Sequence, residues 1–506
     1  MRIHYVKIQK YKNLKVFSID LNEKQMYAIL LGQNASGKSN FIEALVAIFR
    51  NLQLEENPEF SYEIKYECRG YNVKVVADAE LAENKTYYQY WINENRISGA
   101  DFKKEKLKYL PRYVIAYYSG SNLRLEGQFF KPMSQAYKNL LDDEREHFRT
   151  FFYSFPIYKE LLLLSFFCFP EEGNEVKDFL EEYFDIESID SLLFELKRPY
   201  WAKNKSDRKY INHNEISFWQ TRPSVFDFLK QLHEISLAPI QNEIKIPVNF
   251  HSEDTQEVVY LYIPSIEQFQ KIAQQFHGEI NFFQALDSLY LSDLIQSVRI
   301  KLNKATGNDS IFFSELSEGE QQLIAVLGLI RFTKSKESLI LLDEPDTHLN
   351  PIWKWRYTKL LKKYAVRDEK DDTTQIIMTT HDPLVIGGLT KEEIRIFKQE
   401  KVGKKRGEKI VTFEPEIDPR GLGVEGILTS EFFGLETSVD EITFDKLKRR
   451  NELLYKMDEE GLSLAEKAEL KHLFEHLNRL GFAKIDIDPY YREFLKSKGE
   501  ESLQSK

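Results

Sequence analysis

The sequence predicts an α/β protein with a mixed sheet core and an antiparallel β subdomain, interrupted by a compact helical insertion and followed by a small helical block. Three observations predict this class. A glycine-rich loop joins an apolar strand to a helix near the N-terminus, two further apolar strands end in polar turns after residue 330, and helical patterns fill most of the stretch between. Strands that alternate with helices indicate a parallel sheet whose loops gather at one edge.

Composition limits the class of protein. The 506 residues include 70 basic and 80 acidic ones, a net charge of −10, which argues against a wholly basic nucleic-acid binder but allows a local basic patch. Cys68 and Cys168 lie far apart, so we expect no disulfide framework and a reducing cytoplasm. The N-terminus has no apolar signal-peptide core, and the apolar run 161–169 is shorter than the roughly 20 residues that span a bilayer. We therefore expect a buried helix there and no membrane partner.

The first predicted lobe covers residues 1–125. It opens with strands, continues through the glycine-rich loop into a helix, and then alternates apolar and polar residues over 60–118. A period of two with turn residues between the runs indicates an antiparallel sheet, which we expect to include the segment Arg112-Tyr-Val-Ile-Ala-Tyr-Tyr118.

Three further stretches follow. Residues 126–296 read as short helices broken by prolines, with no sustained heptad, and predict a compact, mainly helical insertion. Residues 297–415 return to alternating strands and helices and predict a second lobe of the same α/β core. Residues 416–506 end in two helical runs, the second opened by a Ser463–Glu466 capping box.

The glycine-rich loop is the first motif with a chemical meaning. Gly32-Gln-Asn-Ala-Ser-Gly37-Lys38-Ser39 matches the pattern G-x-x-x-x-G-K-[ST] in full, between a strand and a helix. Such a loop turns backbone amides toward phosphate oxygens, and the helix N-terminus adds partial positive charge. Lys38 would reach the β- and γ-phosphates of ATP, and the Ser39 hydroxyl would ligate Mg²⁺. The candidate nucleotide-binding residues of this loop are Gly32, Asn34, Ala35, Ser36, Gly37, Lys38, Ser39 and Asn40.

A pair of adjacent carboxylates ends a second apolar strand, Leu339-Ile-Leu-Leu-Asp343-Glu344. The carboxyl end of a strand is where open α/β sheets hold their ligands. We predict that Asp343 holds Mg²⁺ and that Glu344 is the general base for the attacking water. An apolar strand ending in Asp-Glu is a weak signal alone, and the preceding glycine-rich loop makes it a strong one.

Two more polar turns complete the pattern. Leu316-Ser317-Glu318-Gly319-Glu320 begins a helix about 20 residues before the acidic strand, and Thr380-His381-Asp382 ends a third apolar strand. Taken alone, the first reads as an N-cap serine in a solvated acidic turn and the second as a structural histidine. Their order after the other motifs favours a role at the nucleotide for Ser317, Gly319, Glu320 and His381.

The segment Asp346-Thr-His348-Leu-Asn350, between the acidic strand and His381, is a fifth motif. The five motifs in this order resemble the ABC-type ATPase heads of the SMC, RecF and OLD group. The resemblance covers residues 1–125 and 297–415. It implies hydrolysis of ATP to ADP and phosphate, a homodimer formed around ATP and Mg²⁺, and a Ser317 that completes the site of the opposite subunit. In such heads the switch histidine, here His381, contacts the γ-phosphate, and the loop at 346–350 crosses the dimer interface.

Two further segments resemble PtuA, the ATPase of Septu-type anti-phage defence systems, whose relatives also accompany retrons. They are Val114–Asn122 and Gly423–Leu435. This resemblance implies a regulatory ATPase, in a homodimer or a higher oligomer, that controls a partner HNH endonuclease. The alternative is a RecF- or SMC-like DNA-binding ATPase of repair without a nuclease partner. A transport ATPase is disfavoured by the long insertion and the C-terminal block.

Some assignments stay open at this point. The usual Q-loop glutamine is missing after the strand that ends at Tyr118, so either Gln128 or Gln135 is displaced or Tyr118 and Ser119 line the site. The resemblance suggests Lys12 and Asn13 as nucleotide contacts after the first strand.

Two basic segments, 401–409 and 203–209, could meet DNA or retron RNA–DNA, although exposed lysines more often mark solvated loops. The Asp486–Asp488 pair and Asn212–Asn214 lack the frames of Toprim and HNH nucleases, so we expect no nuclease centre in this chain.

Overall fold

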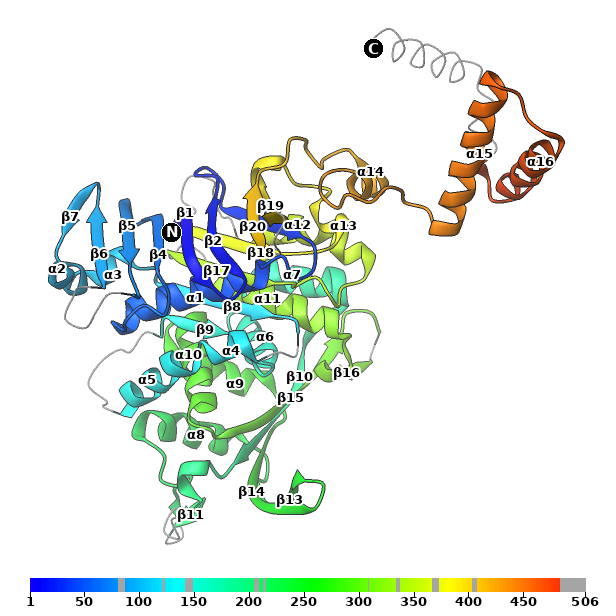
Figure 1. Cartoon of the computed structure of the whole chain (residues 1–506). Coiled ribbons are helices and arrows are strands. Elements are labelled where there is room, and N and C mark those ends of the chain that lie inside the picture. Colours follow the sequence, from blue (N-terminus) through cyan, green and yellow to red (C-terminus); the bar gives the residue numbers. More distant parts are fainter. Residues whose placement is uncertain are drawn as a thin grey trace. The chain divides into compact units, whose positions relative to one another are not determined.

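The computed structural model describes two units separately (Figure 1). They are Met1–Gly423 and Val424–Lys506. The described residues are 1–80, 87–120, 123–141, 149–203, 209–212, 215–307, 309–333, 337–365, 373–402 and 407–482.

A seven-stranded sheet forms the centre of the first unit, in the order β20-β19-β3-β18-β17-β8-β9. The strands are β3 (Tyr27–Gly32), β8 (Tyr113–Tyr118), β9 (Phe151–Tyr153), β17 (Ser338–Asp343), β18 (Thr374–Thr379), β19 (Ile394–Val402) and β20 (Gly407–Phe413). All neighbours are parallel except β19 and β20. Every residue of β17 and β18 is buried, as expected for central strands of a sheet covered on both faces.

An antiparallel sheet in the order β2-β1-β4-β5-β6-β7 lies within the same unit. Its strands are β1 (Arg2–Tyr11), β2 (Leu14–Asp20), β4 (Tyr62–Cys68), β5 (Tyr71–Ala77), β6 (Tyr88–Ile92) and β7 (Asn95–Ile97), followed by the short helices α2 (Gly99–Lys104) and α3 (Lys106–Tyr109). Burial alternates along β4 and β5, which is the period-two pattern of the sequence.

Helix α1 (Lys38–Leu54) joins the two sheets through aromatic contacts. Phe41 contacts Phe397 of β19 and Phe17 of β2, and Phe49 packs edge-on against Tyr66 of β4. The helix begins at the glycine-rich loop, so this packing also fixes the direction of that loop.

One prediction about the first lobe was wrong. Residues 113–118 do not continue the antiparallel sheet, because β8 pairs in parallel with β17 from Tyr113↔Ser338 to Tyr118↔Asp343. Its first four residues are buried in succession. An uninterrupted apolar run of this length suits a strand covered on both faces, whereas an alternating strand has one face in water.

The inserted stretch contains helices, as predicted, and also strands that were not predicted, which form a five-stranded sheet with two expected strands after residue 294. The helices are α4 (Arg124–Gly127), α5 (Phe130–Leu141), α6 (Tyr158–Cys168), α7 (Pro170–Phe184), α8 (Pro223–Ile235), α9 (Ile266–Ala273) and α10 (Glu279–Leu291). The sheet order is β13-β14-β10-β15-β16, with β10 (Ile186–Lys197), β13 (Ile240–Asn249), β14 (Ser252–Ile263), β15 (Ile295–Lys304) and β16 (Ser310–Phe312). A small hairpin is formed by β11 (Ile211–Asn212) and β12 (Glu215–Ile216).

The missed strands have a physical explanation. In β10 the buried residues Ile186, Ile189 and Leu192 are three apart, which imitates the spacing of a helix face. The strand β15 was expected, but it pairs with β10, so the inserted sheet extends past the expected boundary at residue 297. Helix α6 is buried along most of its length, as predicted from its apolar run. Within the described residues, no helix is both long and apolar enough to cross a membrane.

The remaining helices of the first unit follow the later motifs. They are α11 (Glu318–Thr333), α12 (Pro351–Ala365) and α13 (Pro383–Ile386), with short 3₁₀ turns at Tyr200–Ala202, Gln274–Phe276, Phe313–Glu315 and Lys391–Glu393. Helix α11 packs against α6 of the insertion and α12 of the head.

The C-terminal helices form a hairpin with its own small core. After α14 (Gly423–Thr429), helices α15 (Glu441–Glu459) and α16 (Leu464–Arg479) bury Leu453, Leu470 and Leu473 against each other. Arg449–Glu469 at 2.8 Å and Lys456–Glu466 at 2.7 Å join the two helices. The predicted capping box at Ser463 and Glu466 begins α16.

Candidate functional site

The glycine-rich loop lies between β3 and α1, and its backbone needs glycine at both ends. Gly32 and Gly37 have φ values of 149° and 96°, and a Cβ on Gly32 would lie 2.3 Å from the carbonyl oxygen of Phe397. Ala35 also has a positive φ of 62°. Asn13 and Gln399 both donate to the carbonyl oxygen of Ala35, at 2.9 and 3.0 Å, which holds this strained turn in place.

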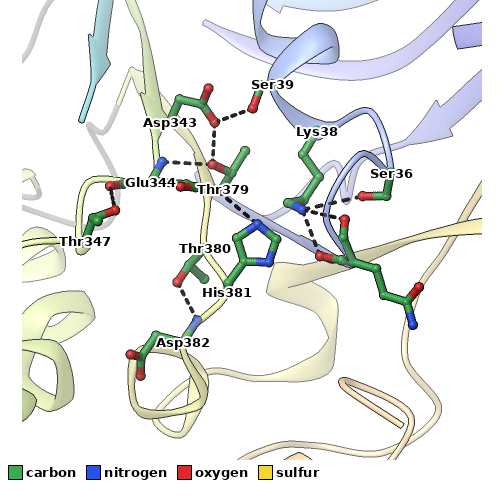
Figure 2. Close-up of polar contacts among 12 residues, drawn as sticks. Ser36, Lys38, Ser39, Asp343, Glu344, Thr347, Thr379, Thr380, His381 and Asp382 are labelled. Carbon is green, nitrogen blue, oxygen red and sulfur yellow. Dashed lines mark hydrogen bonds and ion pairs between the residues drawn. The ribbon is translucent and has the colours of Figure 1, made fainter. Parts of the chain in front are cut away.

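Lys38 folds back over the loop (Figure 2). Its Nζ donates to the carbonyl oxygens of Gly32 and Gln33, at 2.8 and 3.2 Å, and to Ser36 Oγ at 3.4 Å. Burial lowers the pKa of Lys38 to about 8, against the opposing effect of Glu344 and Asp343. A buried ammonium held by carbonyl dipoles at a helix N-terminus is suited to an anion such as phosphate.

Ser39 and Asp343 meet although they are far apart in the chain. Ser39 Oγ donates to Asp343 Oδ1 at 3.0 Å, and Thr379 Oγ1 donates to the same oxygen at 2.6 Å (Figure 2). Burial raises the pKa of Asp343, and the hydrogen bonds from Thr379 and Ser39 oppose that shift. A hydroxyl beside a carboxylate, next to a phosphate-binding loop, fits Mg²⁺, which typically takes few protein oxygens and completes its shell with phosphate and water. The described residues contain no cluster of three or more His, Cys, Asp or Glu side chains that could hold a metal ion.

Glu344 and His381 form a second pair at the same edge of the sheet. Glu344 Oε1 lies 2.9 Å from His381 Nε2, and this hydrogen bond is the main cause of a lowered pKa at Glu344. The Glu344 backbone adopts φ 51°, which turns its side chain away from the line of β17. Both side chains are about one-third exposed, so water and a ligand can reach them.

Ser317, Gly319 and Glu320, which were predicted to act at the nucleotide, lie at the N-terminus of α11. Ser317 and Glu320 form a capping box, in which the hydroxyl and the amide of Ser317 both donate a hydrogen bond to Glu320 Oε2 at 2.8 Å. Gly319 lies against the loop after β17, and a Cβ there would be 2.5 Å from the His348 carbonyl oxygen. Within the described residues, the side-chain hydrogen bonds of Ser317 go to Glu320 of the same helix end.

The suggested nucleotide contacts after β1, Lys12 and Asn13, both have partners within the chain. Lys12 forms an ion pair with Glu43 of α1, and Asn13 accepts from Asn40 at 2.6 Å besides bracing Ala35. Asn13 therefore braces the glycine-rich loop, and its contact with a nucleotide stays a prediction. Asn34 is exposed at its tip.

The residues considered in place of the missing Q-loop glutamine lie in different parts of the structure. Gln128 accepts a hydrogen bond from Arg50, and Gln135 is exposed on α5. Ser119 instead reaches the acidic strand, because its amide donates to the Asp343 carbonyl oxygen at 3.3 Å and its hydroxyl lies 3.1 Å from Thr347 Oγ1. Of the candidates, Tyr118, which lies opposite Asp343 in the sheet, and Ser119 are at the site.

Several residues near the site were missed from the sequence. Thr379 binds Asp343, Thr380 donates to Asp346 at 2.9 Å, and Gln322 of α11 donates to the Pro345 carbonyl oxygen at 2.9 Å. Burial raises the pKa of Asp346 to about 6. The one available signal was the Thr-Thr pair directly before His381.

The centres of the predicted nucleic-acid segments, 204–208 and 403–406, lie outside the described residues. So do Asp486, Asp488, His213, Asn214 and Asn122.

Comparison with known proteins identifies the family. Residues 106–387, more than half of the chain, match the family described as "AAA domain, putative AbiEii toxin, Type IV TA system", so the chain belongs to this AAA family of ATPases. Among its relatives, the chain is similar to the Septu protein PtuA of Bacillus mycoides, with 26% identity over 44% of this chain and 32% of that protein. The match thus spans about a third of that PtuA. The chain is also similar to the retron Vc95 probable ATPase of Vibrio cholerae, with 22% identity over 79% of this chain and 74% of the relative.

A further relative and a solved structure complete the comparison. The retron Ec83 probable ATPase of Escherichia coli is 22% identical over 79% of this chain and 72% of its own length. The SMC head domain from Thermotoga maritima aligns over 82% of this chain and 100% of its own, with a TM-score of 0.33 and 13% identity. The relatives confirm the resemblance to PtuA-like ATPases.

Because the His348 backbone lies close to Gly319, a side chain at position 319 should destabilise the protein. Gly319→Ala places a methyl group against the His348 backbone, which cannot rotate away, so we expect the free energy of unfolding to fall by about 1–3 kcal/mol. The measurement is denaturant unfolding of the full chain. Gly388→Ala is the matched control, because its new Cβ would lie 3.9 Å from its nearest neighbour, Thr358 Oγ1. Equal midpoints for the two variants would contradict the packing of α11 on this loop.

Proposed function

We propose that this chain binds ATP with Mg²⁺ and hydrolyses it to ADP and phosphate, as the regulatory subunit of an anti-phage defence complex. One observation carries the catalytic part. Lys38, Ser39, Asp343, Glu344 and His381 come from three separated segments and meet at one edge of the parallel sheet, with the contacts described above. The membership of the AAA family supports the same activity.

In this proposal each residue has one task. The amides of the loop and the Lys38 ammonium bind the β- and γ-phosphates, and the N-terminus of α1 adds its dipole. Ser39 and Asp343 would hold Mg²⁺, which supplies charge neutralisation on the phosphate oxygens. Glu344 takes a proton from the water whose oxygen forms the new bond to the γ-phosphorus, while the bond to the β–γ bridging oxygen breaks and ADP leaves. His381 holds Glu344 through its Nε2 and would contact the γ-phosphate, as the family resemblance implies.

We also infer that the catalytic unit is a homodimer, or a higher oligomer built from such dimers. Ser317, Gly319 and Glu320 lie at the N-terminus of α11, where Ser317 is exposed and pairs with Glu320, while Gly319 is buried against the loop after β17. A helix N-terminus is suited to an anion, so a second copy could place it at the γ-phosphate of its partner. A twofold arrangement would give both sites the same partner contact.

The proposed partner is an HNH endonuclease, since the PtuA and retron relatives suggest a defence system. The α15–α16 hairpin is the proposed docking element. It has its own core, and it also exposes Ile442 and Leu464 at 68% and 88%. The two buried thiols, Cys68 and Cys168, are unpaired, in keeping with a cytoplasmic location.

Substitution of the general base tests the catalytic assignment. Glu344→Gln removes the proton acceptor but keeps the side-chain shape, so we expect ATP to bind normally and hydrolysis to slow by a factor of about 10² or more. Lys38→Ala should instead weaken ATP binding, measured by titration with a fluorescent ATP analogue. Wild-type turnover by Glu344→Gln would remove Glu344 from the mechanism.

A mixing experiment tests the shared site. Ser317→Arg blocks the contribution of one chain to its partner, and Lys38→Ala blocks phosphate binding in its own chain. Each variant alone should be inactive, and a mixture should recover activity, because one heterodimer site then has both an intact loop and an intact Ser317. Differently tagged chains show whether heterodimers form. If they form and ATP turnover does not recover, the sites are not shared.

The docking proposal predicts a separable loss of partner binding. A chain that lacks residues 436–506 should retain ATP hydrolysis but no longer co-purify with an HNH endonuclease encoded beside it, because the hairpin is absent. In the full-length chain, Ile442→Ser with Leu464→Ser should weaken the same interaction while the hairpin core stays intact. Leu453→Ala, which damages that core, serves as the comparison. Wild-type recovery of the endonuclease by the shortened chain would place docking on the first unit.

A further inference from the structure

The hydroxyl group of Thr379 lies between the two acidic residues that end β17. Its Oγ1 donates to Asp343 Oδ1 at 2.6 Å and accepts the amide N–H of Glu344 at 2.9 Å (Figure 2). Thr379 is completely buried, so solvent does not compete for either hydrogen bond. One hydroxyl therefore uses both its donor and an acceptor position on two neighbouring residues that the proposed mechanism needs.

The sheet register makes this contact possible. Thr379 is the last residue of β18 and lies directly opposite Asp343, the last residue of β17. At Glu344 the chain leaves the strand with φ 51°, a left-handed conformation that residues other than glycine seldom adopt. The Glu344 amide then finds its acceptor in the Thr379 side chain. The same turn directs the Glu344 carboxylate to His381.

Asp343 is held from two sides. Its Oδ1 accepts from Ser39 of the phosphate-binding loop and from Thr379 of β18. The first contact joins the carboxylate to the loop, and the second fixes the carboxylate to the sheet. Loss of the second contact would leave Asp343 with a single hydroxyl donor among its recorded partners and with more rotational freedom.

We propose that Thr379 is a positioning residue for ATP hydrolysis, which fixes the Asp343 carboxylate for Mg²⁺ and the Glu344 turn for the attacking water. This inference rests on the proposed ATPase function. The competing explanation is that Thr379 is a buried β-branched residue whose hydroxyl only satisfies the end of a strand. The two explanations differ in what a valine at this position would change.

The test compares three variants of the full chain. Thr379→Val keeps the shape and strand preference but removes the hydroxyl, and Thr379→Ser keeps the hydroxyl. Thr374→Val is the matched control, because Thr374 is equally buried, at 1% exposure, at the opposite end of the same strand. Each variant is assayed for kcat and KM for ATP, for the Mg²⁺ concentration that half-saturates binding of a fluorescent ATP analogue, and for thermal unfolding.

We expect Thr379→Val to lower kcat by about 10-fold or more, with KM changed much less, since two hydrogen bonds at the reacting end of the site are lost. The half-saturating Mg²⁺ concentration should rise several-fold, and analogue binding in EDTA should be unchanged. Thr379→Ser should restore most of kcat and the Mg²⁺ requirement. Thr374→Val should match the wild type in both.

Two outcomes overturn the inference and are distinct from failure of the function. A folded Thr379→Val protein with wild-type kcat and Mg²⁺ requirement refutes the positioning role, provided that Glu344→Gln is inactive in the same assay. Equal losses in Thr379→Val and Thr374→Val refute it too, because they indicate a general effect on β18. If the wild-type chain itself neither binds nor hydrolyses ATP, the proposed function fails before Thr379 is tested.

Discussion

The candidate site depends on the parallel pairing of β3, β18 and β17. Because these neighbours run in the same direction, their carboxyl ends reach one edge of the sheet, and the three polar turns that follow them become adjacent. The register then decides which side chains touch. Thr379 lies opposite Asp343, and β3 delivers the loop that carries Lys38 and Ser39 to the same edge. A slip of one residue in the register would turn the alternate side chains of β18 to the other face of the sheet.

Two ionised groups of the site, Lys38 and Asp343, are destabilised by burial, and a ligand of opposite charge would reduce that cost. Burial lowers the pKa of Lys38 and raises the pKa of Asp343, so both ionised groups are less stable here than in water. Carbonyl and hydroxyl dipoles compensate part of that penalty. A polyphosphate with a divalent cation would supply the missing opposite charges, and ligand binding to the folded state would therefore stabilise the chain.

The inserted stretch is tied to the head by packing. Helix α6 lies against α11, whose first turn carries Ser317 and Gly319, and against α10. Beneath it, Arg149 forms a buried ion pair with Asp287, and Tyr158 joins both residues by hydrogen bonds. These buried hydrogen bonds connect α6 with α10, and α6 in turn packs against α11.

The sequence by itself determined the features that depend on local spacing. The glycine-rich loop, the Asp343–Glu344 pair, the capping box at Ser463 and the buried α6 all follow from residues that are neighbours in the chain, since glycine conformation, helix capping and apolar runs are local properties. The family resemblance followed from the order of those motifs.

Only the tertiary structure decided the long-range pairings. The apolar run 113–118 is compatible with either sheet, and burial on both faces assigned it to the parallel one. The strand β10 resembles a helix until its partners β14 and β15 are known. The partner of Gln128, Arg50, could not be read from the sequence, and Thr379 was an ordinary strand residue until the register placed it beside Asp343. Each of these facts depends on a contact between residues distant in the chain, and spacing along one segment carries no information about such a contact.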